Sequence, residues 1–166
     1  MVNEDDVEEE LRRHVHRLAR RVRRRGLATS IQMIRRLRNE VEKMLYNMSF
    51  AMVDIFKIAP MVSAMTTTAI TVAKSVPVYG DAINKLLQKG VTITLLPISE
   101  DLIKPFPREI TLSGDLDTAY QRCFDVGEDE VERMLRQIYC GYALLNLMSL
   151  VTVVKTPEAV TTAEAT

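Results

Sequence analysis

Arginine side chains are concentrated in one stretch of the sequence, residues 11–39, which contains no acidic residue and no lysine. A guanidinium group is planar and donates hydrogen bonds in a fork that matches two oxygens of a phosphate, so arginine suits this ligand better than lysine does. The chemistry predicted from this stretch is therefore phosphate binding. Eleven arginines carry the prediction: Arg12, Arg13, Arg17, Arg20, Arg21, Arg23, Arg24, Arg25, Arg35, Arg36 and Arg38.

The charge of this stretch is balanced by the rest of the chain. The sequence has 22 basic and 22 acidic side chains, so residues 11–39 carry +11 and all other residues sum to −11. Eleven clustered like charges repel one another and are tolerated when a polyanion neutralises them. A helix face that is only solvated usually alternates in sign and gains ion pairs four residues apart. The pattern therefore favours nucleic acid as the partner over an acidic protein or an anionic membrane surface.

The placement of the arginines also indicates how a nucleic acid is bound. Around a helix over residues 5–25 they cover roughly 220° of the circumference. A protein that reads bases in one groove presents a few varied side chains, including Asn or Gln, on one face. Here nearly every polar position is arginine, which predicts phosphate contacts without base readout by several subunits around a duplex. Lys43 on the next helix completes the predicted phosphate-binding set.

Other catalytic and metal-binding patterns are absent from the sequence. It contains no signature of a dinucleotide, P-loop, zinc-protease or serine-hydrolase site. His14 and His16 are two residues apart on the predicted helix and point roughly 200° apart, so they cannot hold one metal ion. Cys123 and Cys140 show no CxxC pattern, and we expect free thiols. We therefore predict no catalytic residue, no metal and no cofactor, and hence no enzyme.

The elements that must position the arginines are mostly helices. Five apolar residues from Val7 to Val22 fall within an arc of roughly 80° and predict a helix over 5–25, with one protein neighbour. After a short joint at 27–30, apolar residues at steps of three and four predict a second helix over 31–58. Pro60 is the predicted end of that helix.

The remaining chain predicts a compact, mainly helical core. The pattern is mainly α, with an arginine-rich N-terminal helix–turn–helix arm, a helical-bundle core and a small β-hairpin near 91–112. Further helices are predicted over 61–76, 81–89, 115–125 and 128–154, and strands over 91–98 and 108–112. The predicted domains are a basic nucleic-acid-wrapping arm at 1–44, a mostly α core for subunit packing at 45–154 and a C-terminal tail at 155–166.

Two uncharged runs approach the length of a membrane span, Ile58–Ala73 and Gln137–Val154. A spanning helix needs about 20 mostly apolar residues, and both runs contain polar residues. Helices that protein covers on most sides are also apolar all round. We therefore expect buried core helices, with a small membrane protein carrying a basic cytoplasmic arm as a further alternative.

The arginine-rich helix, the short turn, the second helix with Arg35, Arg36 and Arg38 and the apolar, mostly α core together resemble one protein group. These are the major capsid proteins of filamentous and rod-shaped archaeal viruses: the rudivirus, lipothrixvirus and tristromavirus group. The resemblance lies in architecture and charge placement across most of the chain, and the hairpin near 91–112 makes it most similar to the tristromavirus proteins.

The resemblance implies a helical virion built from paired subunits, with N-terminal helices that wrap double-stranded DNA in A-form. In such a virion, Arg12–Arg25 and Arg35–Lys43 line the DNA, and residues after about 44 form the outer shell. The partners implied are DNA, other copies of the chain, a paralogous coat subunit and, in some of these viruses, a lipid envelope.

The function predicted is a structural virion protein that coats double-stranded DNA independently of sequence and assembles into a helical filamentous capsid. Its predicted localisation is the virion, with the host cytoplasm as the place of assembly. The first alternative is a cellular chromatin or nucleoid protein, which would bind duplex without building a filament.

Overall fold

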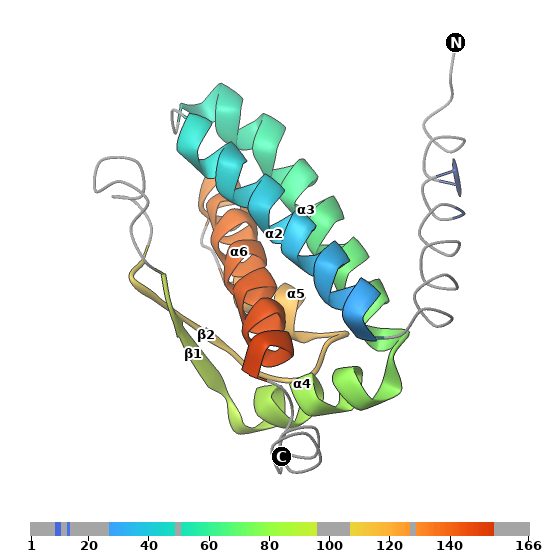
Figure 1. Cartoon of the computed structure of the whole chain (residues 1–166). Coiled ribbons are helices and arrows are strands. Elements are labelled where there is room, and N and C mark those ends of the chain that lie inside the picture. Colours follow the sequence, from blue (N-terminus) through green and yellow to red (C-terminus); the bar gives the residue numbers. More distant parts are fainter. Residues whose placement is uncertain are drawn as a thin grey trace.

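The computed structural model describes residues 9–10, 13, 27–48, 51–95, 107–126 and 129–154. Within these ranges the chain is mainly helical with one two-stranded antiparallel sheet, which confirms the predicted fold class (Figure 1). The elements in chain order are α2 (Leu27–Asn47), α3 (Met52–Lys74), α4 (Pro77–Lys89), β1 (Val91–Thr94), β2 (Glu109–Leu112), α5 (Ala119–Phe124) and α6 (Glu130–Val154).

Three long helices, α2, α3 and α6, form a bundle. α2 and α3 are joined end to end and run antiparallel, and α6 packs against both of them (Figure 1). α2 buries Ile34, Val41 and Leu45 on one face. In α6, every side chain from Ile138 to Ser149 is buried except Asn146, which is half-buried. Protein therefore covers the part of the C-terminal apolar run from Ile138 to Ser149 on most sides, as expected.

α6 lies close to α3 at Gly141. A Cβ atom at this position would lie 2.6 Å from Thr66 Oγ1 and 2.7 Å from Val62 Cγ1. Both neighbours are fully buried and have little room to move. Glycine is therefore required here, because only a residue without a side chain allows the two helices to approach so closely.

Replacing this glycine tests the packing. We expect Gly141→Ala to lower the free energy of unfolding by about 1–2 kcal/mol, because overpacking of about 2–3 kcal/mol at so close a contact outweighs the roughly 1 kcal/mol gain in helix propensity. Denaturant titration followed by circular dichroism measures the change. The exposed substitution Gln32→Ala in α2 is the control, and it should stay within about 0.5 kcal/mol of the native chain. Unchanged stability of Gly141→Ala would contradict the close approach.

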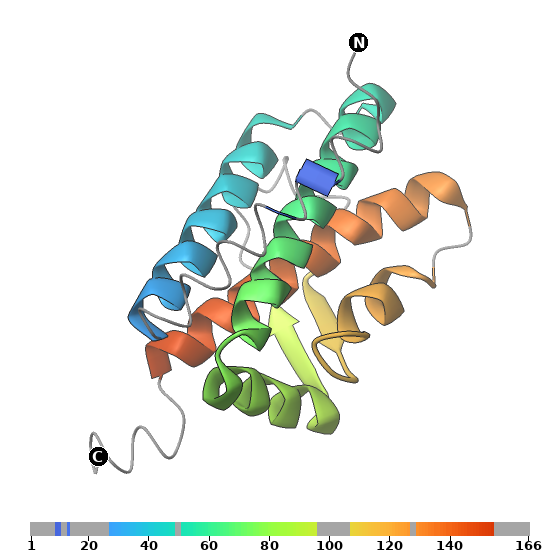
Figure 2. The ribbon, with the colours of Figure 1, turned by 90° about the vertical axis from the view of Figure 1, so that its right-hand side faces the viewer.

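One end of the bundle is closed by α4 and the β-hairpin (Figure 2). α4 begins at Pro77 and ends at Lys89, and it is followed by Gly90, whose φ of +81° favours glycine. The strands place Ile93 and Ile110 inward against the core. Their register pairs Val91 with Leu112, Thr92 with Thr111, Ile93 with Ile110 and Thr94 with Glu109.

Two predicted boundaries are wrong. The joint expected at 27–30 is helical in the structure, since α2 begins at Leu27. The helix expected over 31–58 instead stops at Asn47, and Ala51, in extended conformation, precedes α3. Apolar residues continue at helical spacing on both sides of this break because α2 and α3 bury their faces in the same core. Pro60 lies inside α3, where burial of Ile55, Ala59 and Val62 offsets the lost hydrogen bond.

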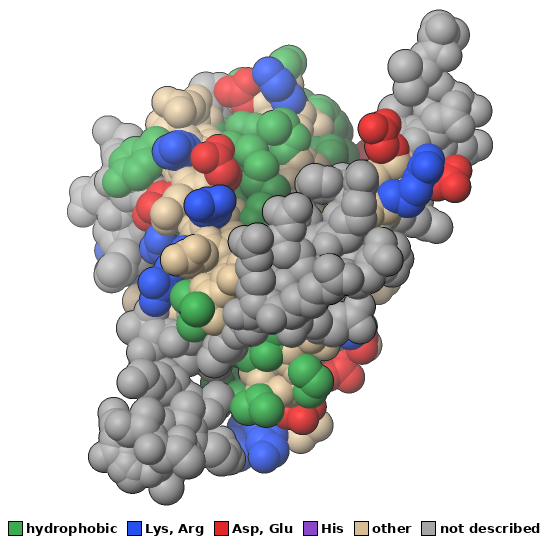
Figure 3. Space-filling model, turned by 45° about the vertical axis from the view of Figure 1, so that its right-hand side comes forward, with side chains coloured by type: hydrophobic (Ala, Val, Ile, Leu, Met, Phe, Trp, Pro, Cys, Tyr) green, Lys and Arg blue, Asp and Glu red, His purple; other side chains and the backbone are tan. Residues whose placement is uncertain are grey.

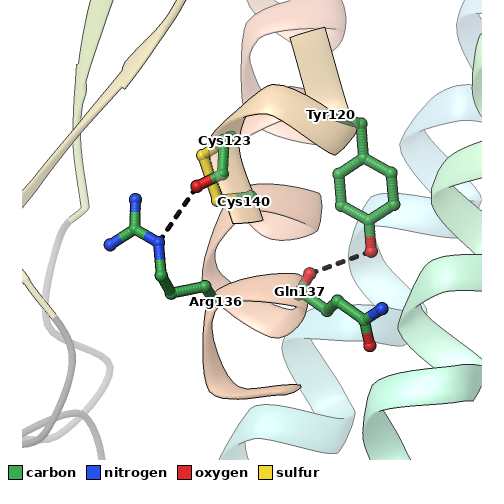
Figure 4. The surroundings of a disulfide bond; sticks show 5 residues. All are labelled: Tyr120, Cys123, Arg136, Gln137 and Cys140. Atoms are coloured by element: carbon green, nitrogen blue, oxygen red, sulfur yellow. Dashed lines mark hydrogen bonds between the residues drawn. A yellow bond between two sulfur atoms is a disulfide. The ribbon is translucent and has the colours of Figure 1, made fainter. Parts of the chain in front are cut away.

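The expectation of free thiols is also wrong. Cys123 on α5 and Cys140 on α6 form a disulfide, with their Cα atoms 6.0 Å apart (Figure 4). Two hydrogen bonds link the same two segments: Arg136 Nε donates to the Cys123 carbonyl at 3.0 Å, and the Tyr120 hydroxyl donates to the Gln137 carbonyl at 3.0 Å. The spacing of 17 residues did not reveal the pair because it depends on the packing of α5 against α6.

Several tyrosine hydroxyls are buried in this core. The Tyr79 hydroxyl donates to the Met148 carbonyl at 2.8 Å. Burial raises the pKa of Tyr79 far above its ordinary value, and it raises the pKa of Tyr120, Tyr139 and Tyr142 to about 12. These phenols therefore stay protonated in the folded state at pH values where they ionise in the unfolded chain.

These pKa values predict unfolding in alkali. A group whose folded pKa lies above its unfolded value of about 10 contributes stability that is fully present below pH 10. That contribution is lost as the pH rises through the folded value of about 12. In a Tyr46→Phe variant, which lacks the exposed tyrosine, we expect phenolate absorbance at 295 nm and loss of helical circular dichroism to appear together. Phenolate formation with intact helicity up to pH 12 would contradict this, and Tyr120→Phe, with one such group fewer, should move the loss to higher pH.

Candidate nucleic-acid interface

The structure describes five of the twelve predicted phosphate-binding residues: Arg13, Arg35, Arg36, Arg38 and Lys43. Arg13 is helical and exposed, as are the preceding acidic residues Glu9 and Glu10. The other seven, with most of the predicted helix over 5–25, lie outside the described residues: Arg12, Arg17, Arg20, Arg21, Arg23, Arg24 and Arg25.

The solvent face of α2 brings three of the predicted residues together. Arg35, Arg36 and Lys43 are all exposed and fall within an arc of about 100° on the helix. The neutral side chains Gln32 and Asn39 lie between them. This basic face of α2 is opposite the side that packs into the bundle, so its three cations point away from the core.

The ion pairs around this face are weak. In the parts of the chain that the structure describes, no carboxylate forms an ion pair with Arg35 or Arg36. Lys43 Nζ lies 3.5 Å from Glu40 Oε1, and both side chains are mostly exposed. Exposed pairs of this kind contribute about 0–1 kcal/mol. Lys43 can therefore exchange this carboxylate for a phosphate at little free-energy cost.

Arg38 has different surroundings from the other predicted residues. It is half-buried, and its Nε donates a hydrogen bond to Asn146 Oδ1 on α6. Its guanidinium lies 3.6 Å from Glu42 Oε2 and 5.9 Å from the centre of the Tyr142 ring. The structure thus holds Arg38 between α2 and α6, apart from the basic face of α2. Helical spacing could have predicted the half-buried position of Arg38, because Arg38 is four residues after buried Ile34 and lies on the same side of α2.

Tyr142 completes this polar contact between the two helices. Its hydroxyl donates to Glu42 Oε1 at 3.0 Å. Burial, and then the nearby Glu42 carboxylate, raise the pKa of Tyr142 to about 12, so the phenol remains a donor. The linked side chains fix the rotation of α2 about its axis, and this rotation sets the direction in which the basic face points.

Arg38 should contribute more to the stability of the fold than the exposed Arg35 and Arg36 do. We expect Arg38→Gln to lower the free energy of unfolding by about 1–3 kcal/mol, because a charge-assisted hydrogen bond and the partner of Glu42 are lost. Arg35→Gln and Arg36→Gln, on the exposed face, serve as matched controls and should change it by less than about 0.5 kcal/mol. Urea denaturation of the three variants makes the comparison, and equal stabilities would contradict the role assigned to Arg38.

No metal or cofactor site emerges from the described ranges. Among them, no three His, Cys, Asp or Glu side chains gather closely enough to hold a metal ion. An open hollow of about 410 Å³ between α3 and α5 is lined mainly by hydroxyl and apolar groups. Two of its hydroxyls, on Thr67 and Thr71, donate to backbone carbonyls one turn earlier in α3. The basic face of α2 remains the candidate site.

One described helix, α3, is long and apolar enough to cross a membrane by length and composition alone. A third of its apolar stretch is buried inside the protein, at 33%. The run expected at Ile58–Ala73 therefore belongs to a helix that packs in the bundle on one side and faces outward on the other.

Comparison with known proteins gives no match. No protein-family model fits the chain, and no curated protein sequence or solved structure is significantly similar to it. The features of the chain that indicate a function are therefore the arginines of 11–39 and the basic face of α2.

Proposed function

We propose that this chain is a structural coat protein that binds double-stranded DNA through arginine–phosphate contacts, without sequence preference, and assembles into a helical filamentous capsid. The observation that carries the proposal is the charge segregation, +11 within residues 11–39 and −11 elsewhere. A duplex presents one negative charge per about 1.7 Å of its axis, which is the density of charge that such a stretch can neutralise.

The basic face of α2 supports the proposal. Arg35, Arg36 and Lys43 lie on one exposed helix face, and Arg35 and Arg36 have no acidic partner among the described residues. The proposed sequence independence rests on residues 11–25, where nearly every polar position is arginine, a residue suited to phosphate contacts. In this proposal residues 1–44 supply the phosphate contacts and residues 45–154 supply subunit packing, with α2 also serving the bundle.

The disulfide supports a location in the virion. Disulfides persist on virion surfaces and in other oxidising surroundings, and they are rare in the cytosol of most cells. Cys123 and Cys140 form such a bond. A particle component that assembles in the host cytoplasm and then leaves the cell meets oxidising conditions in its mature state. The resemblance to archaeal virus coat proteins adds A-form DNA, a paralogous coat subunit and an optional envelope to the proposal.

Electron microscopy tests the proposal directly. The purified chain, with its paralogous subunit where one is co-encoded, is mixed with linear duplex of random sequence and imaged. We expect rods or filaments whose length follows the length of the DNA. Beads or irregular condensates at saturating protein would instead indicate a chromatin or nucleoid protein. Absence of binding to duplex would overturn both readings.

A further inference from the structure

The outer side of α3 is an exposed apolar surface. Val53 is 76% exposed and Met52 is 56% exposed, and Phe56 and Met61 are also exposed. Hydrophobic side chains gather at the end of the bundle where α2 joins α3, near the top of Figure 3. We call this surface the α3 face, and it comprises Met52, Val53, Phe56, Pro60, Met61, Ala64, Thr67, Thr68 and Thr71.

The threonines of the α3 face are less polar than their composition suggests. The hydroxyls of Thr67, Thr68 and Thr71 donate to the carbonyls of Ser63, Ala64 and Thr67 at 2.6–3.1 Å. Their donor hydrogens are used inside the helix, so the side chains offer mainly methyl groups to a neighbour. α3 is described along its whole length. The exposed Lys57 also lies on this face and half-buried Asp54 borders it next to Met61, so the charges near the face are confined to the first two turns and to Lys74 at the helix end.

The extent of this apolar surface matches a protein contact. The exposed parts of Met52, Val53, Phe56 and Met61, with those of the smaller residues of the α3 face, amount to roughly 500 Å². This is within the range of the largest apolar patch on a typical monomer, which is often a functional surface. Two such surfaces in contact bury roughly 1,000 Å², the lower limit for a specific interface between proteins.

A bilayer is disfavoured as the occupant by the neighbouring helix. α2 runs beside α3 over most of its length (Figure 1). If α3 crossed a membrane, the basic face of α2 would enter the hydrocarbon with it. Each of Arg35, Arg36 and Lys43 would then cost about 2.5–3.5 kcal/mol near the centre of the bilayer. A protein surface can cover the α3 face without burying these three cations.

We propose that the α3 face packs antiparallel against the α3 face of a second copy of this chain. The face is bulky in its first half, at Val53, Phe56 and Met61, and small in its second half, at Ala64, Thr68 and Thr71. An antiparallel two-fold contact places the bulky half of each copy on the small half of the other, so the two surfaces are self-complementary.

The proposed contact gives the coat its building block: a dimer with two basic arms. It rests on the proposed function in one respect, since a coat must be built from repeated copies. It is independent of the arginines, because the basic face of α2 and the α3 face are different surfaces. Dimer formation is therefore expected with or without DNA.

Analytical ultracentrifugation of the full chain without DNA tests the contact. We expect a dimer at micromolar concentration, and we expect the double variant Val53→Glu with Phe56→Glu to weaken it by at least about 100-fold. Ala64→Glu, at an exposed helical position, is a second variant should the first not fold by circular dichroism. Val78→Glu on α4, where valine is 65% exposed, is the matched control and should remain a dimer.

Three outcomes would overturn the proposal. These are a native chain that is monomeric without DNA, a dimer that survives both α3-face substitutions, and binding to neutral lipid vesicles that Val53→Glu with Phe56→Glu abolishes. Failure of the proposed function looks different, because the native chain would then form the dimer yet not bind duplex DNA. Binding of duplex by a monomeric native chain would overturn the α3 contact and leave the DNA-coating function standing.

Discussion

Replacing Arg20, Arg21, Arg23, Arg24 and Arg25 by glutamine is expected to weaken binding to duplex DNA by roughly 10³-fold or more at physiological salt. Each arginine–phosphate contact releases condensed counterions, so each contributes about 0.9 to the slope of log K against log salt. Five lost contacts should therefore reduce that slope by about 4.5. Fluorescence anisotropy with a labelled duplex at several salt concentrations measures both quantities.

A matched control separates this effect from a general change in charge. Lys85, Lys89, Arg108, Arg122 and Arg133 are five exposed cations outside residues 11–39. Their joint replacement by glutamine changes the net charge by the same amount, yet we expect less than about a tenfold loss of affinity and little change in slope. Equal losses for the two variants would show that net charge, and not the arginine stretch, determines binding.

Removing the disulfide has the largest expected effect on stability. The bond between Cys123 and Cys140 closes a loop of 17 residues. A loop of this size restricts the unfolded chain by about 3 kcal/mol in the chain-entropy account. We expect Cys123→Ala with Cys140→Ala to lower the free energy of unfolding by that amount and the melting temperature by roughly 6–12 °C.

Reductant provides the control for this pair. The native chain should move toward the melting temperature of the double variant when reductant is added, and the double variant should not respond. Differential scanning calorimetry with and without reductant makes the comparison. The assignment fails if both thiols of the denatured native chain react with an alkylating reagent before any reduction.

The sequence was sufficient to predict the elements with strong periodicity. The last helix, expected at 128–154, is α6 at Glu130–Val154, and the hairpin expected near 91–112 is present as β1 and β2. Alternating β-branched residues and threonines in Val91–Thr94 carry the strand signal. The helical spacing of apolar residues carries the signal for α6. Both patterns are predictive because they reflect which side chains pack in the core.

The incorrect predictions concern the break between α2 and α3, Pro60 and the disulfide. Each of these features depends on tertiary contacts that a single sequence does not specify. The end of α2 at Asn47 and the start of α3 at Met52 interrupt no apolar pattern, because the two helices pack on the same core. Pro60 is a helix breaker by intrinsic propensity, yet tertiary packing of Ile55 and Val62 holds it within α3. The disulfide depends on how α5 folds back on α6, which no local spacing specifies.

At the candidate site, too, local features were predicted from the sequence and long-range contacts were not. Exposure of Arg35, Arg36 and Lys43 agrees with their polar positions on the predicted helix. The partners of Arg38 come from the C-terminal helix, more than a hundred residues later, at Tyr142 and Asn146. Such a long-range contact is visible only once α2 and α6 are packed together. The role of the arginine stretch in binding DNA remains a prediction.

The salt dependence of duplex binding by the native chain tests the central claim most directly. If each subunit neutralises about ten phosphates, the log–log slope is near −9 per bound subunit, and it is the same for duplexes of different sequence. Anisotropy titrations from about 50 to 200 mM salt cover the range in which such binding falls by 10³–10⁵-fold. A slope near −2, or strong dependence on base sequence, would contradict a coat held by its arginines.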